Sequence, residues 1–225
     1  IIYNAILLFI RVIVLLIYDE VMSGAGRTGK YLSAEHWDVV PDLVAVAKGL
    51  AAGYMPLGAC LASSEIVSTV EKAGGFAHGH TYSASPIAAA VGRAVLAEYL
   101  EHGLIDNAAR MGERLRAGLL KLRERHEFIG EVRGKGLLLG FDVTANRTTG
   151  APLPPELNAH LALTGAAYSR GLIIYSRRTL DGKARDNFLV SPALTVTEAE
   201  VDEILHLLGQ SLDEFSRLLQ EHGLS

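Results

Sequence analysis

Two apolar runs, each closed by a charged residue, constrain the fold of this chain most. The run at residues 12–17 leads into Asp19, and the run at residues 43–47 leads into Lys48. Continuous apolar runs rich in β-branched residues are typical of parallel strands buried on both faces. In open α/β sheets, ligands bind beyond the carboxyl ends of such strands. We therefore expect a carboxylate and an amine at the same edge of one sheet, with room for a ligand between them.

Composition narrows the classes of partner and compartment. The chain has 225 residues, 49% of them hydrophobic, and a formal net charge of −4. This mild acidity gives no reason to expect a nucleic acid or an anionic membrane as partner. The single cysteine, Cys60, excludes an internal disulfide and a multi-cysteine zinc site. A reducing, cytoplasmic location is the simplest expectation.

Residues 1–18 are almost wholly apolar, and by length they could span a bilayer. Arg11 would then lie inside the membrane, at a cost of about 2.5–3.5 kcal/mol on insertion scales. No small-residue cleavage site precedes Asp19, which argues against a signal peptide. The sequence favours a buried strand beginning near Val12 and predicts no structure for residues 1–11. Because the first residue is Ile1 rather than Met, the chain is expected to be a fragment or a processed form.

The remaining pattern predicts an α/β domain over residues 1–115 and a smaller α+β domain over residues 116–225. Alternating apolar runs, Gly-rich turns and helical stretches fill the first part, and the composition shifts after the helix near residue 125. Helices are expected at residues 64–72, 87–100, 104–125, 155–171 and 197–222, and further strands at 57–62, 129–143, 172–175 and 188–190. The alanine content of the helix at 87–100 predicts its burial. Thr197 and Glu200 form a capping box.

The segment from Gly24 to Lys30 fits most of a phosphate-binding loop and follows a strand, which raises a nucleotide-binding hypothesis. Tyr31 stands where a Ser or Thr would contact Mg²⁺. Five residues separate the strand from the first glycine, and no helix is predicted to follow the loop. The sequence therefore favours a structural turn.

Two further motifs have simple alternatives. His78 and His80 could suggest a metal site, but no acidic residue or cysteine stands at ligand spacing, so loop histidines are expected and no metal. The segment 133–136, Arg-Gly-Lys-Gly, could hold an anion or could form a turn between strands. The sequence leaves these two interpretations open.

Several motifs, taken together, closely resemble one enzyme family. The stretch at residues 19–30 reads Asp-Glu-Val-Met-Ser-Gly-Ala-Gly-Arg-Thr-Gly-Lys, and Ala-Lys-Gly-Leu follows at 47–50, Gly-Tyr-Met-Pro-Leu-Gly at 53–58 and His-Thr-Tyr at 80–82. These motifs, in this order, resemble the class III (ω-amino acid type) aminotransferases over residues 15–100. A weaker likeness continues through Arg133-Gly134 and Ser191-Pro192 to the C-terminus.

The resemblance implies the type I fold of pyridoxal-phosphate transferases, with part of a large, mostly parallel-sheet domain and a smaller α+β domain. It implies that Lys48 binds pyridoxal 5′-phosphate covalently and shuttles a proton, and that Asp19 faces the pyridine nitrogen. Val21, two residues further along an extended strand, would pack on the cofactor ring. Thr81 would reach the phosphate of the cofactor in a neighbouring subunit, which implies a homodimer with shared active sites.

The implied reaction moves an amino group from an amine or ω-amino acid to an oxo-acid or aldehyde. Arg185 is the expected ligand of the substrate carboxylate, with Arg177 and Arg178 as rivals. The chain departs from the family at Met22, where some relatives carry a glutamine, and it lacks the upstream part of the large domain. A catalytically inactive remnant or an assembly partner is therefore the alternative interpretation, and the donor and acceptor stay unnamed.

Overall fold

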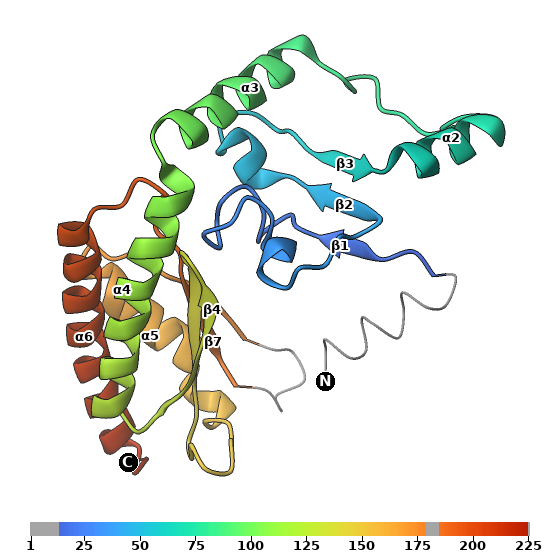
Figure 1. Ribbon diagram of the computed structural model, residues 1–225. Coiled ribbons are helices and arrows are strands. Elements are labelled where there is room, and N and C mark those ends of the chain that lie inside the picture. The colour runs from blue at the N-terminus through green and yellow to red at the C-terminus, as the bar shows by residue number, and fades with distance from the viewer. Residues whose placement is uncertain (1–13, 179–184, 225) are drawn as a thin grey trace. The chain divides into compact units, whose positions relative to one another are not determined.

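The computed structural model describes residues 14–178 and 185–224, and its contacts divide the chain after Asp106 into two compact units (Figure 1). This division falls inside helix α4 (Leu104–Arg125), the helix in which the domain boundary after residue 115 was predicted. Residues 1–11 and the predicted strand start at Val12 lie outside the described residues. Within the described part, none of the helices has both the length and the apolar character needed to cross a membrane.

The first unit contains a mixed three-stranded sheet in the order β1-β2-β3. Strand β1 (Ile17–Asp19) pairs in parallel with β2 (Leu43–Val46), as predicted, and β2 pairs antiparallel with β3 (Ala59–Ala62). The predicted burial of the first strand on both faces is wrong, because Ile17 is 65% exposed. Strand β1 is an edge strand whose only partner among the described residues is β2.

Two α-helices of the first unit begin within one residue of the predicted starts at 64 and 87. Helix α2 (Ser64–Lys72) is capped by the Ser63 side chain, which accepts a hydrogen bond from the Ile66 amide, and α3 (Pro86–Glu101) has Pro86 in its first turn. The predicted burial of α3 is wrong for most of the helix, in which only Ala88, Val95 and Tyr99 are buried. Alanine is a strong helix former on any face, so its abundance did not indicate burial.

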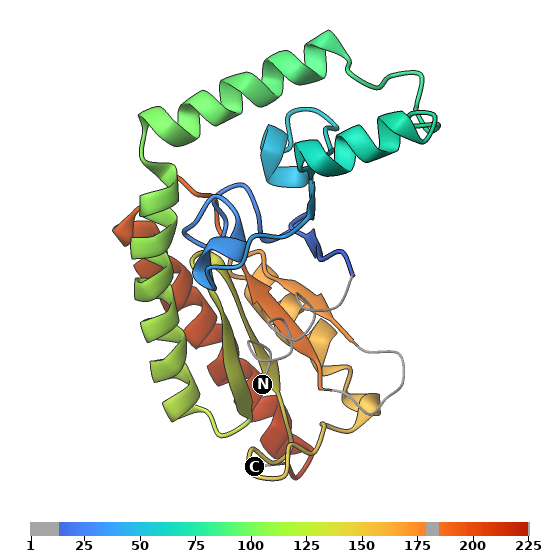
Figure 2. The ribbon, with the colours of Figure 1, turned by 45° about the vertical axis from the view of Figure 1, so that its right-hand side comes forward.

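The second unit contains a four-stranded antiparallel sheet in the order β4-β5-β7-β6. Its elements are β4 (Ile129–Lys135), β5 (Leu138–Val143), β6 (Tyr175–Arg177), β7 (Asn187–Val190), α5 (Ala159–Tyr168) and α6 (Glu198–Glu221). The helix predicted at 155–171 is interrupted at Asn158, whose φ of 47° ends a short 3-10 turn before α5 begins. The Phe141 and Phe188 rings stack at 5.1 Å within the sheet, and α5 packs on β6 and α6 (Figure 2).

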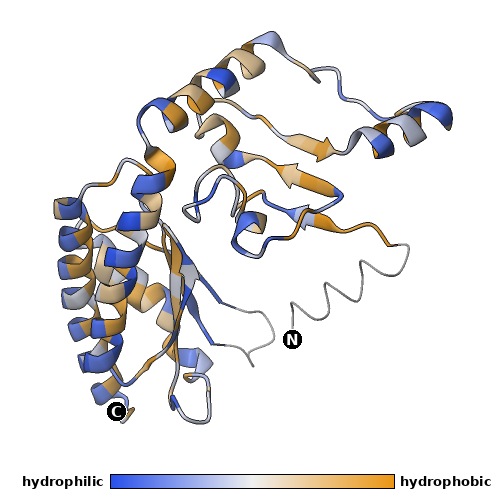
Figure 3. Ribbon diagram, in the orientation of Figure 1, coloured by the Kyte–Doolittle hydropathy of each residue, from blue (hydrophilic) through white to orange (hydrophobic). Residues whose placement is uncertain are grey.

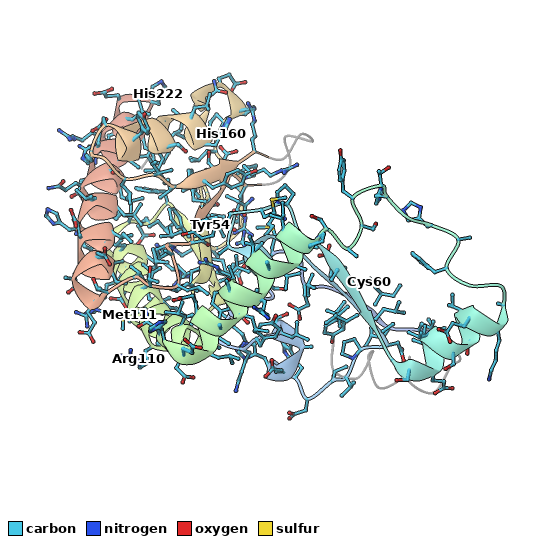
Figure 4. All side chains as sticks on the ribbon, turned by 90° about the horizontal axis from the view of Figure 1, so that it is seen from above. Tyr54, Cys60, Arg110, Met111, His160 and His222 are labelled. Atoms are coloured by element: carbon cyan, nitrogen blue, oxygen red, sulfur yellow. The ribbon has the colours of Figure 1, made fainter. Side chains whose placement is uncertain are left out.

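Helices α4 and α6 lie side by side, and both alternate apolar and polar faces (Figure 3). A Cβ at Gly118 of α4 would lie 2.2 Å from a Leu205 methyl of α6, so a larger residue there would require the Leu205 side chain to shift. On α4, Met111 is buried whereas its neighbour Arg110 is exposed (Figure 4). The predicted capping box at the start of α6 is confirmed, with the Thr197 amide donating to Glu200 over 2.8 Å.

The Arg-Gly-Lys-Gly segment ends strand β4 and, at Gly136, begins the tight turn into β5. Gly134 and Gly136 have φ values of 118° and 54°, a region that favours glycine. A Cβ placed on Gly112 of α4 would lie 2.3 Å from the Gly136 carbonyl group. The turn therefore presses directly against the helix, which supports the turn interpretation over an anion site.

Candidate active site

The acid and the amine singled out in the sequence lie at the same edge of the first sheet. Asp19 is the last residue of β1 and is paired with Ala45 of β2. Lys48 opens the 3-10 turn η2 (Lys48–Ala51) just after β2 ends at Val46. Because the two strands are parallel, their carboxyl ends meet at one edge, and both side chains are exposed there.

The Asp19 carboxylate is oriented by its own turn. Its Oδ1 accepts a hydrogen bond from the Val21 amide over 3.0 Å, in the manner of an Asx turn. The expectation that Val21 continues an extended strand is wrong, because β1 ends at Asp19 and Val21 begins a turn. Val21 remains half-buried beside Asp19.

Glu20, which the sequence reasoning missed, is 1% exposed and organises the loop behind Asp19. Its carboxylate accepts hydrogen bonds from the Ser23 hydroxyl (2.5 Å), the Ser33 hydroxyl (2.6 Å) and the Ala34 amide (2.9 Å). Burial alone would raise the pKa of the Glu20 carboxyl, but these hydrogen bonds together outweigh it and lower the pKa. The sequence signal that could have revealed this role of Glu20 is an acidic residue directly after a strand, followed by serines.

Replacing Glu20 with alanine should destabilise the first unit by on the order of 3 kcal/mol, because the buried Ala34 amide loses its acceptor. Since folding lowers the pKa of Glu20, its contribution is present above the ordinary value of 4.5 and is lost as the pH falls through the folded value. The fluorescence of Trp37, the single tryptophan, during denaturant unfolding at several pH values measures both effects.

Glu20→Gln is the matched control, since the amide keeps the shape and one acceptor oxygen. The Glu20→Gln variant should remain folded, but its stability should lose the pH dependence that Glu20 contributes at acid pH. Equal stability losses in the wild type and in Glu20→Gln, as the pH falls from 7 through the acid range below 4.5, would contradict the assignment.

The Gly-rich loop that resembled a phosphate-binding loop uses its amides internally. Gly24 donates to the Glu20 carbonyl, Gly26 to the Tyr31 carbonyl and Gly29 to the Gly26 carbonyl, at 2.9, 3.2 and 3.0 Å. A phosphate cradle requires such amides to be free. The loop is therefore the structural turn that the sequence favoured.

Lys48 has an unusual backbone conformation. Its φ is 45°, in the left-handed region that non-glycine residues seldom adopt, and it follows an extended Ala47. Holding a residue in this region costs on the order of 1–3 kcal/mol, and such residues cluster at functional sites. The turn thus presents the lysine at the sheet edge under local strain.

Thr81 lies in an exposed turn of the first unit. In this turn the His80 amide donates to the Ser83 hydroxyl over 3.1 Å, and the His78 and His80 rings meet edge to face at 4.9 Å. No group of three or more potential metal ligands occurs among the residues that the structure describes. Because Thr81 is exposed, the turn presents its hydroxyl group at the surface of the first unit.

Arg185 lies in the second unit and forms an ion pair there. Its Nη1 is 3.3 Å from Oδ2 of Asp142, whose side chain is 4% exposed. The same carboxylate accepts a hydrogen bond from Nη1 of Arg133 over 3.0 Å. Of the two rivals, Arg178 donates to Asn158, and Arg177 forms no ion pair with any other described residue.

A lysine amine is one of the groups that form Schiff bases with carbonyl cofactors, and here it lies at the same sheet edge as a carboxylate. The chain belongs to the class III aminotransferase family, whose model, described as "Aminotransferase class-III", matches residues 11–212. Enzymes of this family depend on pyridoxal phosphate.

Curated relatives agree with this assignment. The chain is 39% identical over 210 residues to "Uncharacterized aminotransferase YodT" of Bacillus subtilis, covering 92% of this chain and 47% of that protein. It is 36% identical over 203 residues to "Probable gamma-aminobutyrate transaminase 3, mitochondrial" of Oryza sativa subsp. indica, covering 88% of this chain and 38% of the relative. The chain therefore spans half or less of the length of these relatives.

Solved structures share its fold. A transaminase from the marine bacterium Virgibacillus has a TM-score of 0.87 at 31% identity, covering 97% of this chain and 48% of that one. An (S)-enantioselective omega-transaminase from Thermomicrobium roseum has a TM-score of 0.84 at 36% identity, covering 95% and 46%. The predicted type I fold, present here in part, is confirmed by these neighbours.

Proposed function

We propose that this chain supplies the lysine and the carboxylate of a pyridoxal-phosphate-dependent aminotransferase site. The reaction would move an amino group from an amine or ω-amino acid to an oxo-acid or aldehyde. The observation that carries this proposal is the placement of Asp19 and Lys48 at one edge of the parallel β1–β2 pair, in a chain of this family.

The residues present suit the cofactor. Pyridoxal phosphate, when bound, supplies an electron-withdrawing ring that stabilises negative charge on a substrate carbon. The Lys48 amine would hold the cofactor covalently and, when free, carry a proton as a base. The Asp19 carboxylate, which the Val21 amide orients, would keep a proton on the ring nitrogen.

Two further contacts follow from the same assignment. The half-buried Val21 would pack on one face of the ring, and the Thr81 hydroxyl would bind the cofactor phosphate in a second copy of the chain. This arrangement requires a homodimer with shared active sites. The exposure of Thr81 in its turn is consistent with such a contact.

The alternative is that the chain is a catalytically inactive remnant or an assembly partner. One experiment separates the two. Pyridoxal phosphate is added to the protein, the absorbance spectrum is recorded, borohydride is applied, and tryptic peptides are mapped by mass spectrometry. Cofactor fixed on Lys48 supports the enzyme, whereas a colourless protein with an unmodified Lys48 peptide supports the remnant.

For the substrate carboxylate we propose Arg185 as ligand. Arg185→Ala should raise KM for an oxo-acid acceptor by about 10- to 100-fold, since hydrogen bonds to charged groups contribute that much. KM for an aldehyde acceptor, which has no carboxylate, should stay unchanged. Steady-state kinetics with both acceptors tests this.

Arg177→Ala is the control for this prediction, because Arg177 is a rival at the end of β6. It should leave both KM values unchanged. A rise in KM for the oxo-acid alone in Arg177→Ala, with Arg185→Ala unaffected, would transfer the role to Arg177.

A further inference from the structure

We infer that Tyr99 is a positioning residue for Lys48, acting through the carbonyl group of Gly49. The inference rests on the proposed function, because it concerns the lysine that would bind the cofactor. It assigns a task in the site to a side chain of α3, far from Lys48 in sequence.

The contact is direct and partly buried. Tyr99 is 7% exposed, and its hydroxyl donates to the Gly49 carbonyl over 2.6 Å, across 50 positions of sequence. The same carbonyl accepts the Ala52 amide over 3.2 Å, which closes the 3-10 turn that begins at Lys48. Tyr99 therefore binds the carbonyl group of the residue that directly follows the lysine.

The surroundings leave this turn little freedom. A Cβ on Gly49 would lie 2.9 Å from the Ala25 methyl group, so the Gly-rich loop packs against one side of the turn. A Cβ on Gly92 of α3 would lie 2.7 Å from a Leu57 methyl and 3.7 Å from the Leu50 carbonyl, so α3 lies close on another side. Tyr99 supplies the polar anchor of this packing.

Such an anchor is needed because Lys48 has a φ of 45°. A non-glycine residue keeps this conformation only where its surroundings impose it. Burial raises the pKa of the Tyr99 hydroxyl, and the nearby Arg27 only partly offsets this, so the hydroxyl stays protonated and able to donate at neutral pH. The hydrogen bond thus opposes relaxation of the strained turn.

Tyr99→Phe removes one oxygen atom and tests the inference without the cofactor. Hydrogen–deuterium exchange of peptides that span residues 48–54 should quicken by on the order of tenfold, the scale of one hydrogen bond. Val95→Ala, on the same helix at a buried position, is the matched control. It lowers the stability of the unit but keeps the hydroxyl, so exchange at 48–54 should not quicken ahead of the rest of the unit.

The second measurement follows the rate at which added pyridoxal phosphate becomes fixable on Lys48 by borohydride. Tyr99→Phe should slow this reaction by about three- to tenfold relative to the wild type and to Val95→Ala. Unchanged exchange in Tyr99→Phe, or equal effects of both variants, overturns the inference. If the wild type fixes no cofactor, the proposed function fails, while the exchange data still decide whether Tyr99 holds the turn.

Discussion

Replacing Lys48 with alanine is expected to abolish covalent attachment of pyridoxal phosphate and to reduce amino transfer by at least about 10²–10⁴-fold. That range is the contribution of one positioned acid–base group, and the lost nucleophile adds to it. Mass spectrometry after borohydride treatment measures the attachment, and a coupled assay of oxo-acid consumption measures the rate. The Lys48 side chain is exposed, so its removal leaves no cavity. Alanine and lysine are equally strained at a φ near 45°, so the fold should survive the substitution.

Lys30→Ala is the control for this substitution. Lys30 is an exposed lysine in the Gly-rich loop, and it would be essential if that loop bound a nucleotide. It should leave cofactor attachment and rate unchanged. Cofactor fixed on the protein in Lys48→Ala, or its loss in Lys30→Ala, would contradict the assignment of the nucleophile.

Replacing Asp19 with asparagine should reduce kcat by about 10²–10³-fold, the cost of removing one preorganised electrostatic contact in an active site. Affinity for pyridoxal phosphate should fall far less, because the covalent attachment to Lys48 is retained. Asparagine keeps an oxygen that can accept the Val21 amide, so the turn should persist. Cofactor titration and steady-state kinetics separate the two effects.

Asp42→Asn makes the same chemical change at the opposite end of the parallel pair, where Asp42 accepts the Leu16 amide over 2.7 Å. It should leave kcat nearly unchanged. Equal losses of kcat in the two variants would show that Asp19 supports the sheet rather than the cofactor.

Local sequence rules predicted the starts of three helices to within one residue. Ser63, Pro86 and Thr197 each mark a helix start, because a cap or a fixed φ acts within one turn of chain. The interruption at Asn158 was missed, since its positive φ depends on the neighbouring 3-10 turn and not on a glycine. The exposure of β1 was missed too, because an apolar run does not reveal how many neighbouring strands cover it.

The same contrast holds in the site. Asp19 and Lys48 could be placed at one edge, because each ends an apolar run and the runs pair in parallel. Glu20 and Tyr99 could not be assigned their tasks, because each acts through hydrogen bonds to distant parts of the chain. Long-range contacts of this kind leave no periodic trace in a single sequence.

The contact between Gly112 and Gly136 has a consequence for how this chain can change. Where two large side chains meet, growth of one is often relieved by shrinkage of the other. Here both partners already have the smallest side chain that exists, so no second substitution can make room. Any relative that carries a larger residue at position 112 must have moved its helix away from the hairpin.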